Sequence, residues 1–83
     1  MDPEEVKRLI EAGLPGARVQ VTGDGRHFDA TVVHADFSGK PMLAQHRMVY
    51  AALGDRFDTE ILHALALKTF TPEQWASTSG SDT

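Results

Sequence analysis

Apolar and polar residues recur along the first third of the chain with two different periods, and each period predicts a different element. Residues 3–12 carry apolar side chains at helical spacing behind Asp2, which suits a helix N-cap. Residues 18–22 and 28–33 alternate with the period of two that half-buried strands show, and a tight turn over residues 23–25 joins them. The sequence therefore predicts a helix followed by a β-hairpin. The expected core face of the hairpin carries Val19, Val21, Phe28, Ala30 and Val32.

The second half of the chain predicts a helix, a third strand and a short final helix. Residues 41–53 follow a helical period, residues 61–70 are a mostly apolar strand, and residues 71–75 form a capped helical turn. Residues 77–83 are small and polar. We therefore expect one domain over residues 1–76 and a disordered tail after it.

The resulting order of helix, strand, strand, helix, strand and helix favours an α/β fold. A three-stranded sheet with helices packed on one face is the economical way to bury these apolar stripes. The third strand is apolar on both faces, which favours a position with cover on each side or a pairing role. On the second helix, the expected apolar stripe is Met42, Val49 and Leu53, with Tyr50 beside it.

Composition narrows the classes of function. With 83 residues and 24% charged side chains, the chain is typical of one small globular domain. No apolar run approaches the ~20 residues of a membrane-spanning helix, and the acidic start lacks the features of a signal peptide, so we expect a cytoplasmic protein. Cysteine is absent, which excludes disulfides and thiolate metal sites made by this chain alone.

The sequence does not indicate an enzyme. No serine or threonine has a local base that would activate it, and no pair of carboxylates lies on evidently sheltered elements. The net charge of −4 also disfavours nucleic acid as a partner. The only short basic stretch, and hence the candidate surface for a partner or nucleic acid, comprises Lys40, His46 and Arg47.

Four histidines are the remaining candidates for chemistry. His63 lies near the start of the predicted third strand, where it is either a hydrogen-bonded residue at the rim of the core or an exposed ligand. His27 is expected to face solvent at the start of the second strand, and His34 to be structural or solvated. His46 falls on or beside the apolar stripe of the second helix, where we expect a buried, hydrogen-bonded ring.

Five stretches give the chain a specific resemblance to the BolA family, and to its compact bacterial branch in particular. They occur in the family's order and span most of residues 3–76. The resemblance implies an α/β fold similar to the class II KH domain. The matching stretches are Gly23-Asp24-Gly25-Arg26-His27-Phe28, Phe37-Ser38-Gly39-Lys40, His46-Arg47-Met48-Val49-Tyr50, His63-Ala64-Leu65 and Thr71-Pro72-Glu73-Gln74-Trp75.

The resemblance also implies a role in iron–sulfur chemistry. Proteins of this family pair with monothiol glutaredoxins, and the pair holds a bridged 2Fe–2S cluster that the isolated chain lacks. The glutaredoxin and its glutathione supply thiolates, while the BolA-like partner supplies the histidine of its His-Ala-Leu motif, here His63. A second ligand often comes from the loop between the first two strands. That loop is short here, so His27 is the candidate, with Asp24 or water as alternatives.

The family's links to transcription, stress responses and cell shape leave an alternative, a KH-like nucleic-acid-binding regulator with DNA as its partner. Two departures disfavour it. Residues 37–41 lack the Gly-x-x-Gly clamp of KH domains, and Gln45 stands where the family often has an arginine. A free monomer is expected, with a homodimer or a heterodimer as alternatives.

Overall fold

The computed structural model describes residues 2–24, 26–54 and 64–80. The order of helices and strands confirms the predicted α/β fold, and a 3₁₀ helix, η1, lies between the second strand and the second long helix. In chain order the elements are α1 (Pro3–Gly13), β1 (Arg18–Gly23), β2 (Phe28–Val33), η1 (Ala35–Phe37), α2 (Met42–Leu53), β3 (Leu65–Phe70) and α4 (Pro72–Gly80).

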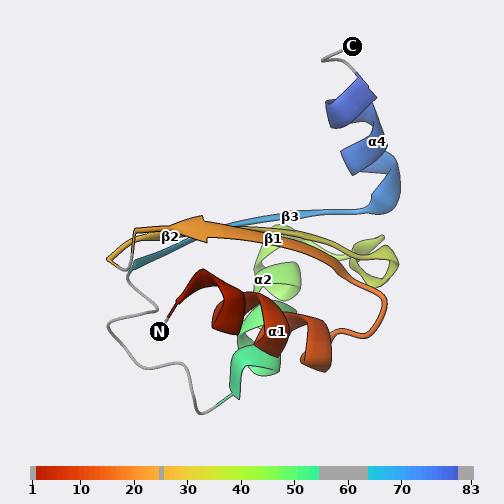
Figure 1. Ribbon diagram of the computed structural model, residues 1–83. Helices are drawn as coiled ribbons and strands as arrows, with labels where there is room; N and C mark the ends of the chain where they lie inside the picture. Colours follow the sequence, from red (N-terminus) through yellow and green to blue (C-terminus); the bar gives the residue numbers. More distant parts are fainter. Residues whose placement is uncertain (1, 25, 55–63, 81–83) are drawn as a thin grey trace.

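The three strands form one mixed sheet in the order β1-β2-β3. β1 is antiparallel to β2, and β3 is parallel to β2, with Phe28 opposite Leu65. The helices α1 and α2 lie on one face of the sheet, as predicted, whereas α4 rises from the end of β3 on the other side (Figure 1). β3 is an edge strand whose outward residues Ala66 and Lys68 are exposed, so it is not covered on both faces.

The helix α1 begins at the cap that the sequence predicts. The Asp2 carboxylate accepts a hydrogen bond from the Glu5 backbone N–H at 3.1 Å. Gly13 is the last residue of the helix, and a Cβ built on it would overlap the side chain of Ala52. The glycine therefore lets α1 and α2 approach closely, in addition to marking the end of the helix.

The core lies between the sheet and the two long helices. On α2 its stripe runs through Gln45, Val49 and Leu53 at intervals of four residues. The prediction that Met42 belongs to this stripe is wrong, because Met42 begins the helix one turn before that stripe and is 67% exposed. The core cluster consists of Val6, Ile10, Leu14, Val19, Val32, Phe37, Val49 and Leu53.

The last two elements differ from the prediction at their boundaries. The strand expected from residue 61 begins at Leu65, and Ala64 before it is helical. Residues 61–63, and therefore His63, lie outside the described part of the chain. The helix α4 continues to Gly80, into the predicted tail, whose residues 81–83 are also outside it.

The start of α4 has the predicted cap. The Thr71 hydroxyl accepts a hydrogen bond from the Gln74 backbone N–H at 3.2 Å, and the Gln74 side chain accepts one from the Thr71 N–H at 2.9 Å. The two bonds fix the direction in which α4 leaves the sheet. In the described ranges, no helix has both the length and the apolar character needed to cross a membrane.

Candidate functional site

The turn between β1 and β2 is closed by one carboxylate. Asp24 Oδ1 accepts hydrogen bonds from the backbone N–H groups of Arg26 at 2.9 Å and His27 at 3.0 Å. The Asp24 N–H in turn donates to the His27 carbonyl at 3.3 Å. A Cβ built on Gly23 would overlap that same carbonyl, so only glycine fits this position without a shift of the backbone.

These hydrogen bonds also change the acidity of the turn. The backbone N–H of His27, followed by that of Arg26, holds the pKa of the Asp24 carboxyl below its ordinary value of 3.8. The imidazole of His27 acts in the same direction through its charge when it is protonated. The carboxylate is therefore ionised at neutral pH, and its negative charge lies close to the His27 side chain.

His27 presents its ring to solvent. The residue is exposed, whereas the next residue, Phe28, is 3% exposed and faces the core. The ring of His27 makes no hydrogen bond or ion pair with the described residues. This matches the expected solvent-facing position at the start of β2. The described residues engage neither ring nitrogen, and a neutral imidazole is a good metal ligand, so the ring can bind an external group.

The register of the sheet brings a second segment to the same end. Phe28 and Leu65 are paired neighbours in the parallel β2–β3 ladder. In the sequence, His27 directly precedes Phe28, and His63 precedes Leu65 by two residues. The sequence neighbours Phe28 and Leu65 are therefore adjacent in the sheet, and His63 itself lies outside the described residues.

His34, at the other end of β2, is a structural residue, as expected. Its Nδ1 accepts a hydrogen bond from the Asp36 backbone N–H at 2.9 Å, and its Nε2 lies 3.1 Å from the Pro15 carbonyl oxygen. Since a carbonyl only accepts, Nε2 carries the proton and the ring is neutral in this arrangement. The side chain is buried with both nitrogens bonded, which leaves none for a metal.

Two of the three residues of the predicted basic surface are presented to solvent. Arg47 and Lys40 are exposed, and the Lys40 ammonium donates to the Asp36 carbonyl oxygen at 2.7 Å. His46 is half-buried, and its Nε2 is buried without a hydrogen-bond partner among the described residues, so the prediction of a hydrogen-bonded ring is wrong. The ring instead lies almost perpendicular to the ring of Tyr50, with 6.5 Å between the two ring centroids. Binding of a partner or DNA here stays a prediction.

Gln45 is a structural connection that the sequence did not predict. Its amide NH₂ donates to the carbonyl oxygens of Phe37 at 3.1 Å and Lys40 at 2.8 Å, and its carbonyl oxygen accepts from the Thr69 hydroxyl at 2.6 Å. The side chain therefore ties α2 to the loop before it and to β3. The available signal was its spacing of four residues from Val49, which places it on the buried stripe.

The described residues do not form a complete metal site. No group of three or more histidine, cysteine, aspartate or glutamate side chains within the described ranges is arranged to hold a metal ion. The sequence contains no cysteine at all. The arrangement can therefore offer individual imidazole ligands, and any thiolate ligand would come from another molecule.

Comparisons with known proteins agree with this fold. The family model described as "BolA-like protein" matches residues 11–74. The acid stress protein IbaG of Escherichia coli K12 is 30% identical over 76 residues, which cover 92% of this chain and 90% of that protein. Human BolA-like protein 1 is 38% identical over 83 residues, which cover all of this chain and 58% of the human protein.

Solved structures give the same result. A bolA protein homologue from Coxiella burnetii matches with a TM-score of 0.80 and 43% identity, over 90% of this chain and 96% of that one. Yeast Fra2 matches with a TM-score of 0.71 and 32% identity, over 92% of this chain and 85% of that one. The likeness therefore extends over nearly the whole chain in both sequence and structure.

Proposed function

This chain belongs to the BolA family, and from that premise we propose that it is the partner of a monothiol glutaredoxin. The two proteins share a bridged 2Fe–2S cluster and act in iron–sulfur trafficking or in iron or redox regulation. The glutaredoxin cysteine and its glutathione supply thiolates, and His63 supplies an imidazole nitrogen. The protein acts as a ligand-donating partner and not as an enzyme.

The observation that carries the proposal is family membership combined with the donor set of this chain. The chain has four histidines and no cysteine, so its contribution to a cluster is imidazole. Nitrogen ligation at one iron raises the reduction potential of a 2Fe–2S cluster relative to all-thiolate ligation. The exposed ring of His27, which forms no hydrogen bond with the described residues, supports the proposal that this end of the sheet carries the ligands.

The geometry of the sheet supports a pair of histidines. Leu65, which follows His63 by two residues in the sequence, pairs with Phe28, which directly follows His27. His27 is therefore the proposed second ligand, with the Asp24 carboxylate or a water as the alternatives.

The residues of the turn act by positioning. Asp24 holds the His27 backbone through its hydrogen bond, and Gly23 gives the turn room to close. A proton on the His27 imidazole competes with a metal ion for the ring nitrogen, so metal binding through His27 should weaken as the pH falls.

Reconstitution with a partner tests the proposal. The full chain is mixed with a monothiol glutaredoxin, glutathione and an iron–sulfur source, and visible circular dichroism follows the cluster. We expect a spectrum that differs from that of the glutaredoxin alone and that His63→Ala abolishes. His63→Cys should restore a bound cluster with a lower reduction potential, because thiolate replaces imidazole. An unchanged spectrum with His63→Ala would contradict the proposal.

A matched pair of variants tests the second ligand. His27→Ala removes the imidazole, whereas Arg26→Ala truncates the neighbouring exposed side chain in the same turn. We expect His27→Ala to change the visible spectrum of the shared cluster and Arg26→Ala to leave it unchanged. Equal effects of the two substitutions would show that the turn matters through its shape and not through the His27 ring.

A further inference from the structure

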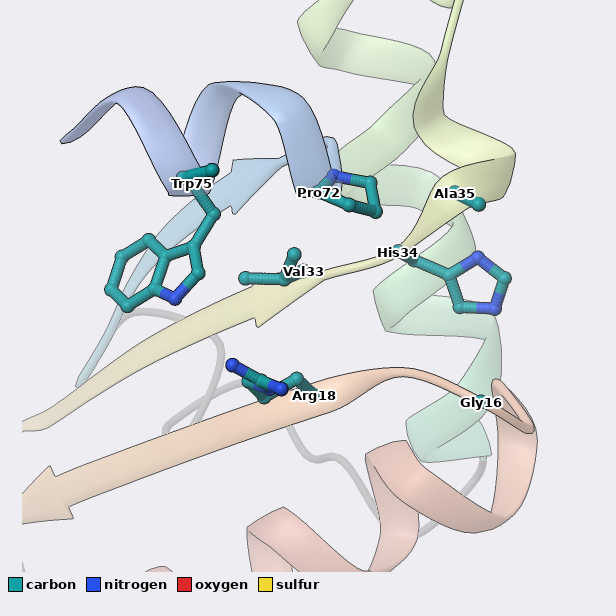
Figure 2. Close-up of a pocket in the computed structure, with 8 residues that line it drawn as sticks. Gly16, Arg18, Val33, His34, Ala35, Pro72 and Trp75 are labelled. Carbon is teal, nitrogen blue, oxygen red and sulfur yellow. The ribbon is translucent and has the colours of Figure 1, made fainter. Parts of the chain in front are cut away.

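A second site lies on the opposite face of the sheet from α1 and α2. A pocket of about 500 Å³ opens between the sheet and the first turns of α4. Its lining includes Arg18 from β1, Val33 from β2, and Pro72 and Trp75 from α4 (Figure 2). This volume lies within the range of small-molecule pockets. The pocket is remote from the β1–β2 turn because it lies at the other end of both strands.

One row of the sheet organises the pocket. Arg18 pairs with Val33 across β1 and β2, and Val33 pairs with Phe70 across β2 and β3. The Trp75 ring lies against Phe70, with 5.4 Å between the ring centroids. In Figure 2 the Arg18 guanidinium and the Trp75 indole both lie beside Val33. The row therefore runs from a cation, across an apolar floor, to an aromatic wall.

The cation of this row is Arg18, which is exposed. Its guanidinium makes no hydrogen bond or ion pair with any residue in the described ranges. None of the residues that line the pocket is acidic. The pocket's other basic residue, His34, uses both ring nitrogens in backbone hydrogen bonds. A guanidinium fork binds carboxylates in a bidentate manner, so Arg18 defines an anion-binding end.

The other end suits a flat apolar group. Trp75 and Pro72 form its wall, and Val33, which is 7% exposed, forms its floor. The β1 and β3 backbones at the two ends of the row lie two strand spacings apart, which is about 10 Å, and the pocket between their side chains has room for a small aromatic ring with a carboxylate. We propose that this pocket binds a small aryl carboxylate, with the carboxylate on Arg18 and the ring against Trp75.

The single tryptophan of the chain reports on this site directly. The ¹⁵N-labelled full chain is titrated with benzoate, and the one indole N–H cross-peak is followed by NMR. We expect a saturable shift with a dissociation constant on the order of 1 mM for so small a ligand. Benzamide has the same shape without the charge, and it should bind about tenfold more weakly because the charge-assisted bonds are lost.

Two arginine variants separate the site from general charge effects. Arg18→Gln should weaken benzoate binding about tenfold, whereas Arg8→Gln, which removes an exposed arginine on the helix-covered side, should leave it unchanged. Sodium chloride at equal ionic strength is the control for screening. Equal binding of benzoate and benzamide, equal effects of the two variants, or a benzoate shift that chloride reproduces would each overturn the proposal. The wild-type comparison with benzamide requires no variant to fold.

Discussion

The two ends of strand β2 each carry a histidine, and the two rings are in opposite situations. His27 precedes the strand, is exposed, and has a ring that forms no hydrogen bond with the described residues. His34 follows the strand, is buried, and has each nitrogen in a backbone hydrogen bond. The same residue type therefore serves two purposes at positions seven residues apart.

The difference shows what decides between a structural and an available histidine. Hydrogen bonds with the Pro15 carbonyl and the Asp36 N–H fix the neutral tautomer of His34, and through them the ring joins the loop before β1 to η1. At the other end, the Asp24 carboxylate binds the backbone of the turn and leaves the His27 ring free. A ring becomes available for a metal when its neighbours satisfy their hydrogen bonds without it.

The largest expected difference is in stability. His34→Ala removes both hydrogen bonds and leaves the Asp36 N–H and the Pro15 carbonyl without this partner, so we expect a loss of about 2–4 kcal/mol in the free energy of unfolding. His27→Ala removes an exposed ring and should change it by less than about 0.5 kcal/mol. Urea unfolding of the two variants measures both values. Comparable losses would remove the distinction between the two ends.

A smaller loss is expected at Gly23. A methyl group there overlaps the His27 carbonyl and approaches the Phe28 ring at 2.9 Å, so Gly23→Ala should destabilise the protein by about 1–3 kcal/mol. The exposed side chain of Gln20, on the same strand, provides the control substitution Gln20→Ala, which should be nearly neutral. The amide shifts of Arg26 and His27 should move only in the glycine variant. A neutral Gly23→Ala would show that the turn has room to spare.

The smallest expected effect is the pH response of the turn. The pKa of Asp24 is lower in the folded protein than its ordinary value of 3.8, so the carboxylate contributes stability at higher pH. This contribution is lost as the pH falls through the lowered value. The NMR chemical shifts of the Arg26 and His27 backbone amides should follow the titration of Asp24, with a midpoint below pH 3.8. Asp24→Asn should abolish that titration, and a midpoint above 3.8 would contradict the assignment.

Local patterns in the sequence predict most of the fold. The cap at Asp2, the hairpin strands and the cap at Thr71 depend on residues close in sequence, and the structure has all three. The sequence misplaces the start of the buried stripe on α2, because the first buried residue of that helix is polar. Gln45 is buried through bonds to two carbonyls and to Thr69, and Thr69 lies 24 residues away. Hydropathy alone does not detect such a residue.

The site is predicted less completely, for the same physical reason. The hydrogen bond between His34 and Pro15 joins residues 19 apart, so only the folded chain distinguishes this ring from that of His27. The role of Gly13 depends on Ala52 of another helix, and the pocket beside Trp75 combines residues from β1, β2 and α4. The assignment of His63 came from family resemblance and remains a proposal.

The most direct test of the central claim is to detect the imidazole nitrogen on the iron. The chain is labelled with ¹⁵N at histidine only, the cluster is assembled with unlabelled glutaredoxin and glutathione, and the reduced complex is examined by pulsed electron paramagnetic resonance. In the His27→Ala background, where His63 is the one remaining proposed ligand, we expect a strong ¹⁵N hyperfine coupling that the further substitution His63→Ala eliminates and that His34→Gln, in a variant that still folds, retains. A reduced cluster without any strongly coupled ¹⁵N, or a coupling that persists in the His27→Ala/His63→Ala double variant, would contradict the account.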